Sequence, residues 1–229
     1  MKAKVYSHKE LIGTTELKVG DEAMGCVYGE FTPTEIYFKT IQKSVREFWR
    51  TDKPNLKKWH SLRLNVQLEN GYFLFPIGGY TINDVQALPN EPKRIDIAGL
   101  DRHIFEDYFQ QNTRRSFLEK PWCQIDIDRK IDLEDELHKE IGFVNRSFLD
   151  FFKIRTNHFL TDFEFSALAT YQRSDDVLFS VHKIEFDKKF AVIHLTWKGK
   201  KEVEDFPATD FFIDFDEFKS MKMYPDKIE

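Results

Sequence analysis

The sequence predicts an α+β protein of two small domains, each an antiparallel sheet packed with helices. Apolar and polar residues alternate along residues 61–69 and again along residues 163–171, which is typical of strands with one buried face. Apolar residues recur at spacings of three and four along residues 38–48 and residues 133–141, which is typical of helices that cover a sheet. Both periods within one chain favour the α+β class.

The boundary between the domains is expected where this periodicity is lost, over residues 110–120. The N-terminal domain then covers residues 1–112, and the C-terminal domain covers residues 121–229. Each stretch is long enough to bury a core of its own.

We expect the N-terminal domain to be built on a hairpin at residues 61–77. Asn70 and Gly71 form the pair that tolerates positive φ at both central positions of a type I′ turn. Residues 72–75 return as the second strand, and Pro76 ends the pairing.

A helix that covers this hairpin is predicted to begin after Thr32 and to end near Arg50. Thr32 and Glu35 have the spacing of a capping box, with Pro33 at the first helical position. The stripe expected to be buried consists of Phe38, Ile41, Val45 and Phe48.

The C-terminal domain is expected to be built on a three-stranded meander at residues 163–197. Before it, Asp132 is the expected cap of a helix at residues 133–141, and residues 143–154 are also predicted to be helical. After it, a capping box of Asp214 and Glu217 predicts a short helix.

The register of the meander follows from its burial pattern. A three-residue loop at residues 187–189 puts Val177 and Phe179 on the face of Ile193, because a slip of one residue would mix polar and apolar side chains. The same loop puts His182 opposite His194 on the polar face.

Composition restricts the function classes. The net charge of −5 argues against a nucleic-acid partner, because phosphate binding needs clustered Lys and Arg. We find no signal peptide and no apolar run long enough to span a bilayer, so no membrane contact and a cytoplasmic location are expected. The two cysteines, Cys26 and Cys123, lack zinc-ligand spacing.

No motif with a catalytic mechanism is present. The sequence has no glycine-rich phosphate loop, no G-x-S-x-G elbow and no H-E-x-x-H pair. We therefore expect neither a cofactor nor a metal centre, and we predict no catalytic residue.

Two sets of polar residues remain as candidates in the C-terminal half. Six carboxylates form an acidic face that suits a basic protein partner: Asp126, Asp128, Asp132, Glu134, Asp135 and Glu136. A second set can hold a metal or move protons if the fold brings its members together: His158, Asp175, Asp176, His182 and His194.

The second half of the chain resembles small uncharacterised bacterial proteins of the immunity type. The most specific stretches are Asp-Asp-Val-Leu-Phe at residues 175–179 and His-Leu-Thr-Trp at residues 194–197. In the first half, Leu-Glu-Asn-Gly-Tyr-Phe-Leu-Phe at residues 68–75 is similar to such proteins. The resemblance implies a stand-alone soluble protein, with some relatives encoded beside toxins, and it carries over no catalytic residue.

These observations favour a non-enzymatic protein-binding module, namely an immunity-type protein that neutralises a basic toxin by occluding its active site. The alternative is a small metal-dependent hydrolase that uses His158, His182 and His194 with Asp175 and Asp176. A third hypothesis is a homo-oligomeric adaptor that uses a sheet edge, and the sequence leaves the oligomeric state open.

Overall fold

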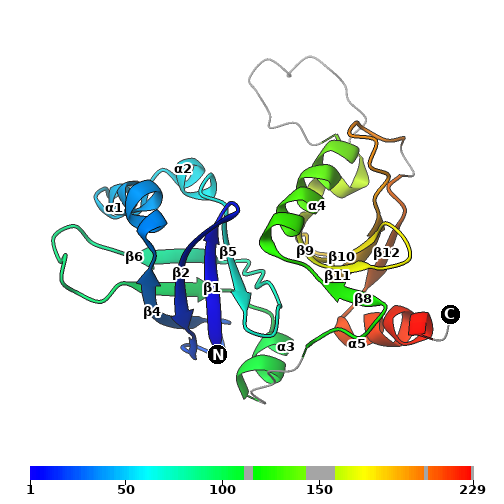
Figure 1. The fold of residues 1–229 in the computed structure, drawn as a ribbon, viewed down its shortest axis with the longest axis horizontal. Helices are drawn as coiled ribbons and strands as arrows, with labels where there is room; N and C mark the ends of the chain where they lie inside the picture. Colours follow the sequence, from blue (N-terminus) through cyan, green and yellow to red (C-terminus); the bar gives the residue numbers. More distant parts are fainter. Residues whose placement is uncertain (111–115, 143–157, 204–205, 228–229) are drawn as a thin grey trace. The chain divides into compact units, whose positions relative to one another are not determined.

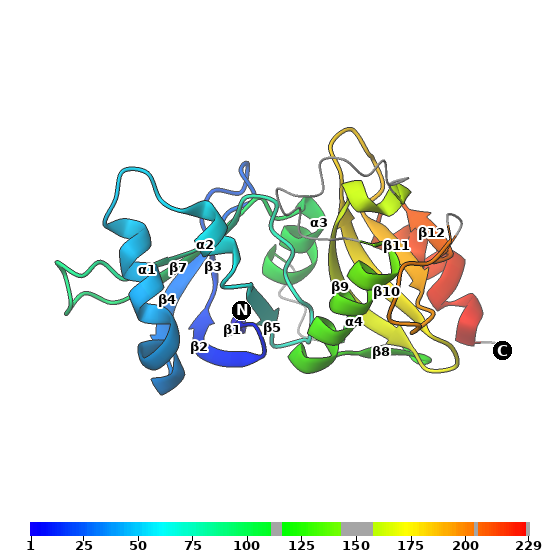
Figure 2. The same cartoon turned by 90° about the horizontal axis from the view of Figure 1, so that it is seen from above.

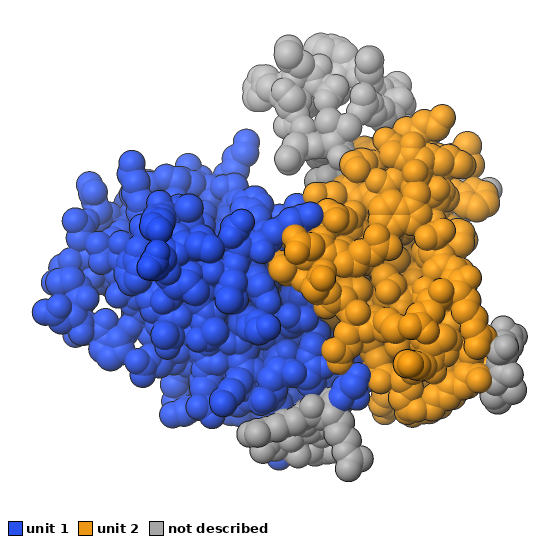
Figure 3. Space-filling view, in the orientation of Figure 1, with its two compact units in different colours: residues 1–117 blue, residues 118–229 orange. Residues whose placement is uncertain are grey.

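The computed structural model describes residues 1–110, 116–142, 158–203 and 206–227. The chain forms two compact units, Met1–Phe117 and Leu118–Glu229 (Figure 1 and Figure 3). Each unit is an antiparallel sheet with helices, which confirms the predicted α+β class. Within the described ranges, every helix is too short or too polar to cross a bilayer.

The first unit is a curled sheet with strand order β5-β1-β2-β4-β7-β6, in which β3 also pairs with β4. Figure 2 labels β1, β2, β3, β4, β5 and β7 of this sheet. All of its pairings are antiparallel. Its strands are β1 (Lys2–Ser7), β2 (Glu10–Glu16), β3 (Lys18–Val19), β4 (Val27–Pro33), β5 (Leu64–Leu68), β6 (Gly79–Asn83) and β7 (Arg94–Ala98). Its helices are η1 (Tyr37–Ile41), α1 (Gln42–Trp49), α2 (Leu56–His60), α3 (Arg102–Ile104) and η2 (Phe105–Gln110).

The predicted hairpin at residues 61–77 is shorter than expected, and its first strand, β5, also pairs with β1. The returning chain makes one bridge, between Gln67 and Phe73, flanked by two backbone hydrogen bonds, from the Leu68 amide to the Tyr72 carbonyl and from the Leu74 amide to the Val66 carbonyl. Of the two turn residues, only Gly71 has a positive φ, so the turn is not type I′. The Gly71 amide donates to the Leu68 carbonyl instead.

The predicted helix forms, but its start and its buried face differ from expectation. Thr32 belongs to β4, so no capping box is made. The first turns are a π-helix, η1, whose hydrogen bonds join residues five apart, such as the Gln42 amide and the Tyr37 carbonyl. This change of register buries Tyr37 completely and leaves Phe38 half exposed.

A buried carboxylate, Asp84, ties this helix to the strands. It accepts hydrogen bonds from Tyr37 Oη and Gln42 Nε2, both at 2.9 Å, and from Arg46 Nε at 3.1 Å. Burial by itself would raise the pKa of Asp84, but these bonds and the charge of Lys93 outweigh it and lower the pKa. The pKa of Tyr37 is raised by burial and by Asp84.

The second unit is a five-stranded sheet with order β12-β11-β10-β9-β8. It contains the predicted meander, β9 to β11. Its strands are β8 (Trp122–Gln124), β9 (Glu164–Tyr171), β10 (Asp176–His182), β11 (Phe190–His194) and β12 (Thr209–Phe212). Its helices are α4 (Ile127–Glu140), η4 (Phe159–Asp162), α5 (Phe215–Phe218), η5 (Lys219–Met223) and η6 (Pro225–Lys227).

The predicted register of β10 against β11 is wrong by six residues. His194 faces Asp176 and not His182, because the connection between the strands covers residues 183–189. The slip is an even number, so the predicted faces survive: Val177 and Ile193 share a face as expected, and in this register they lie directly opposite each other.

Helix α4 begins earlier than predicted, since its cap is Asp126, which accepts from the Arg129 amide at 2.8 Å. Asp132 lies inside the helix. The predicted N-cap of the C-terminal helix α5 is confirmed, because the Asp214 side chain accepts from the Glu217 amide. The helix predicted at residues 143–154 falls outside the described residues.

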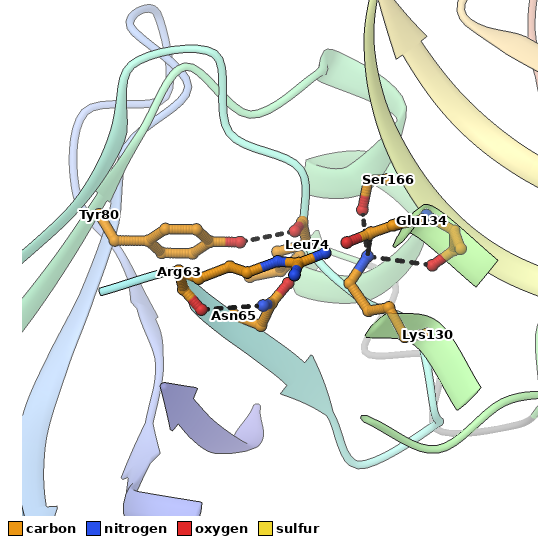
Figure 4. Close-up of polar contacts among 8 residues, drawn as sticks. Arg63, Asn65, Leu74, Tyr80, Lys130, Glu134 and Ser166 are labelled. Atoms are coloured by element: carbon orange, nitrogen blue, oxygen red, sulfur yellow. Dashed lines mark hydrogen bonds and ion pairs between the residues drawn. The ribbon is translucent and has the colours of Figure 1, made fainter. Parts of the chain in front are cut away.

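The buried side of α4 carries an ammonium group, Lys130, with no solvent exposure (Figure 4). Its Nζ donates to Glu134 Oε1 and Ser166 Oγ, both at 2.6 Å, and to the Ala167 carbonyl at 3.2 Å. The Lys130 cluster joins α4 to β9 through paired charges, because an unpaired buried charge would be costly.

In the first unit, Figure 4 shows Tyr80 Oη donating to the Leu74 carbonyl.

We expect Lys130→Met to destabilise the protein by about 3–5 kcal/mol, because Glu134 would be left buried without its cation. The double variant Lys130→Met/Glu134→Leu should recover much of that loss. Urea unfolding measures both. Equal stability of the wild type and Lys130→Met would contradict the assigned role.

The depressed pKa of Asp84 predicts a pH dependence. A carboxyl group with a folded-state pKa below its unfolded value stabilises the fold above the ordinary Asp pKa, and this contribution is lost as pH falls through the folded pKa. The stability difference between the wild type and Asp84→Asn should therefore be largest near neutral pH and shrink below about pH 4. Urea midpoints measured from acid to neutral pH test this, with the exposed Asp52→Asn as control; a constant difference would refute it.

Candidate functional site

A groove of about 500 Å³ lies along the outer side of α4, within the second unit. One wall is the helix and the other is Trp197, three residues after β11. The groove is lined by Arg129, Asp132, Asp135, Glu136, His138, Lys139 and Trp197.

The indole of Trp197 is held in a defined position although 39% of the residue is exposed. Its Nε1 donates to Asp175 Oδ1 at 3.1 Å, and the Arg129 guanidinium lies over the ring at 4.8 Å from the centroid. The backbone at Trp197 has a φ of 56°, which is uncommon for a residue with a side chain. Neighbouring contacts must therefore hold this turn in place.

Two buried carboxylates on α4 supply those contacts. Glu140 Oε1 accepts the amides of Thr196 at 2.7 Å and Trp197 at 2.8 Å. Glu136 Oε1 accepts the amide of Gly199 at 2.9 Å. Three amide donors of the turn, those of Thr196, Trp197 and Gly199, are thus satisfied by one helix, which prepares the groove before any ligand arrives.

Two carboxylates that contact the turn, Glu140 and Glu202, have pKa values shifted in opposite directions. Burial raises the pKa of Glu140, and the charge of Glu136 adds to this, although hydrogen bonds from Trp197 and Thr196 act against it. No described residue donates to Glu140 Oε2. The pKa of Glu202 is lowered by hydrogen bonds from Thr196 and Lys198.

The structure divides the predicted acidic face. Asp126, Asp128 and Asp132 are exposed, and Asp135 is half buried. Glu134 and Glu136 do not belong to that face, because both are buried and hold internal donors; this corrects their prediction as solvated groups.

The five polar candidates are brought together only in part. His194 Nδ1 lies 2.8 Å from Asp176 Oδ1, and Asp175 bonds Trp197 next to them. His182 faces Glu164 at the other end of β10, about 20 Å away along the strand. His158 is buried and caps η4 by accepting from the Leu160 amide.

The three histidines therefore do not form the single site that the sequence suggested, because the register separates His182 from His194. Among the described residues, no group of three or more His, Cys, Asp or Glu side chains is arranged to hold a metal ion.

Sequence reasoning missed Trp197, Arg129 and Glu140. Trp197 extended the apolar alternation of its strand, and Glu140 looked like one more surface acid of a charged helix. A local signal was available in Gly199, which has a φ of 64° and suits a sharp turn directly after the tryptophan.

No protein-family model, curated protein or solved structure matches the chain. Its fold and its site define an α+β protein of two units, one of which carries a preformed charged groove beside an exposed tryptophan.

We expect Glu140→Ala to lower stability by roughly 1–3 kcal/mol, because two turn amides lose their acceptor. Glu140→Gln keeps an acceptor oxygen and should lose much less. Urea unfolding followed by tryptophan emission measures stability together with the environment of Trp197. Equal losses in both variants would contradict the assignment of the two amide bonds.

Proposed function

We propose that this chain is a non-enzymatic protein-binding module whose groove beside α4 receives a basic segment of a partner. The observation that carries the proposal is Trp197, an exposed aromatic side chain held in place by Asp175 and Arg129 inside a charged rim. Aromatic anchors surrounded by polar groups dominate the binding energy of many interfaces.

The preformed turn supports binding over catalysis. Glu136 and Glu140 accept hydrogen bonds from backbone amides, and Asp175 accepts one from the Trp197 indole. A rigid binding surface costs little ordering entropy when the partner arrives. These carboxylates act as supports for the anchor.

Charge supports a basic partner. Residues 118–229 contain 24 Asp and Glu against 17 Lys and Arg. Asp128 and Asp132 are both exposed on α4, and Asp132 lines the groove. Such a surface accelerates encounters with a positively charged protein and makes its binding sensitive to salt.

The same proposal includes an immunity role, in which the partner is a toxin and the module covers its active site. The stretches that carry the resemblance to immunity-type proteins support it, because one ends at Trp197, which lines the groove, and the other begins at Asp175, which accepts from the Trp197 indole. Asp175 and Asp176 begin one stretch, and His194 and Trp197 begin and end the other.

The test is a pull-down from the source cell with the tagged full-length chain, followed by mass spectrometry and calorimetry with the purified partner. We expect a partner with a basic contact segment, and we expect Trp197→Ala to weaken binding at least tenfold, in the range of an interface anchor. The double variant Asp132→Lys/Asp135→Lys should also weaken binding of the partner, and more strongly at low salt than at high salt.

The matched control is Glu10→Lys/Glu16→Lys, which makes the same charge change on exposed strand positions of the first unit. A partner that binds the groove variants and the wild type equally would overturn the proposal. Turnover of a substrate by the purified chain would overturn its non-enzymatic part.

A further inference from the structure

The net charge of the whole chain hides a cationic surface on the first unit. Residues 1–117 contain 17 Lys and Arg against 15 Asp and Glu, although the complete chain is acidic. Within residues 39–58, which cover α1 and the first residues of α2, seven basic residues stand against two acidic ones. The argument from total charge against a nucleic-acid partner does not apply to this surface.

Four of these basic side chains are exposed and form no ion pair with any described residue: Lys43, Arg50, Lys53 and Lys57. Lys39 pairs with Glu35, and Lys58 pairs with Glu47 across the two helices. These four cations lie on both helices and on the segment that joins them, and the charges of Lys43 and Arg50 help to lower the pKa of Glu47. A surface of this kind attracts a flexible polyanion.

A hollow of about 310 Å³ opens between α1 and α2, and Lys53 and the ion pair of Lys58 with Glu47 line it. The rings of Phe48 and Trp59 line it, with centroids 4.3 Å apart and planes inclined by 40°. Trp59 is fixed by its Nε1, which donates to the Tyr80 carbonyl at 2.9 Å. Three short polar side chains also line the hollow: Ser44, Thr51 and Asn55.

We propose that this surface, consisting of the four free cations and the hollow, binds single-stranded nucleic acid. Lysine and arginine contact the phosphates, while the rings of Phe48 and Trp59 supply a platform on which a base stacks. An acidic peptide would pair with the cations but has no planar group for the rings. In a duplex the bases already stack on one another and cannot enter the hollow.

This inference goes beyond the proposed function and concerns the other unit, so either can fail without the other. The experiment measures the fluorescence anisotropy of labelled twelve-residue oligo-dT and oligo-U with the full-length protein at 50 and 200 mM salt. Neutralising four phosphates predicts a slope of about −3 for log K against log salt. Lys53→Ala/Lys57→Ala should reduce the magnitude of this slope by about 1.4.

Phe48→Leu tests stacking, because it keeps apolar volume and removes the ring. It should weaken binding by about fivefold or more without changing the salt slope. The matched control is Lys4→Ala/Lys18→Ala, which removes two exposed cations elsewhere on the same unit and should leave affinity nearly unchanged. Circular dichroism confirms that each variant is folded.

Three results would overturn the proposal. The first is no binding of either oligonucleotide by the wild type at 50 mM salt. The second is equal weakening by the Lys53/Lys57 pair and by the control pair. The third is binding of a duplex or of poly-glutamate as tightly as the single strand, with Phe48→Leu unaffected.

Discussion

Helix α4 is the element on which the second unit depends, because its polar side chains make bonds that an apolar helix could not. Lys130 and Glu134 bind β9, and Glu136 and Glu140 bind the turn after β11. Hydrogen bonds fix direction and register more strictly than apolar contact does. Helix α4 therefore fixes its own position against β9 and the position of the turn that carries the exposed Trp197.

The first unit uses a single buried anion in the same way. Asp84 accepts hydrogen bonds from side chains of η1 and α1, while the basic side chains on the other side of the same helix are exposed to solvent. The π-helical turn makes this division possible, because it turns Tyr37 inward toward Asp84 and Phe38 outward. Core packing and surface charge thus come from one helix.

The two units have opposite surface character, and both proposals depend on that difference. The second unit has more acidic than basic residues and carries an anchored tryptophan in a groove of mixed charge, and the first has more basic than acidic residues and carries a pair of rings in a hollow lined by Lys53, Lys58 and Glu47. A partner with a basic segment and a partner with phosphates would then use separate surfaces. Total charge and total composition average these surfaces and cannot distinguish them.

The sequence by itself determined the α+β class, the meander and the faces of its strands, because alternation of apolar residues depends only on local geometry. It also located the cap at Asp214, which is a bond between neighbours in the chain. It brought Asp175, Asp176 and His194 to attention as polar groups, but it could not say that they meet beside Trp197.

Only the tertiary structure decided the register of β10 against β11, the pairing of β5 with β1 and the burial of Glu134, Glu136 and Glu140. The physical reasons differ. An even slip along a strand leaves every side chain on its own face, so the apolar pattern does not reveal it. A carboxylate on a helix is stable when buried only where donors meet it, and those donors come from distant parts of the chain, so the helix sequence alone does not show that it is buried.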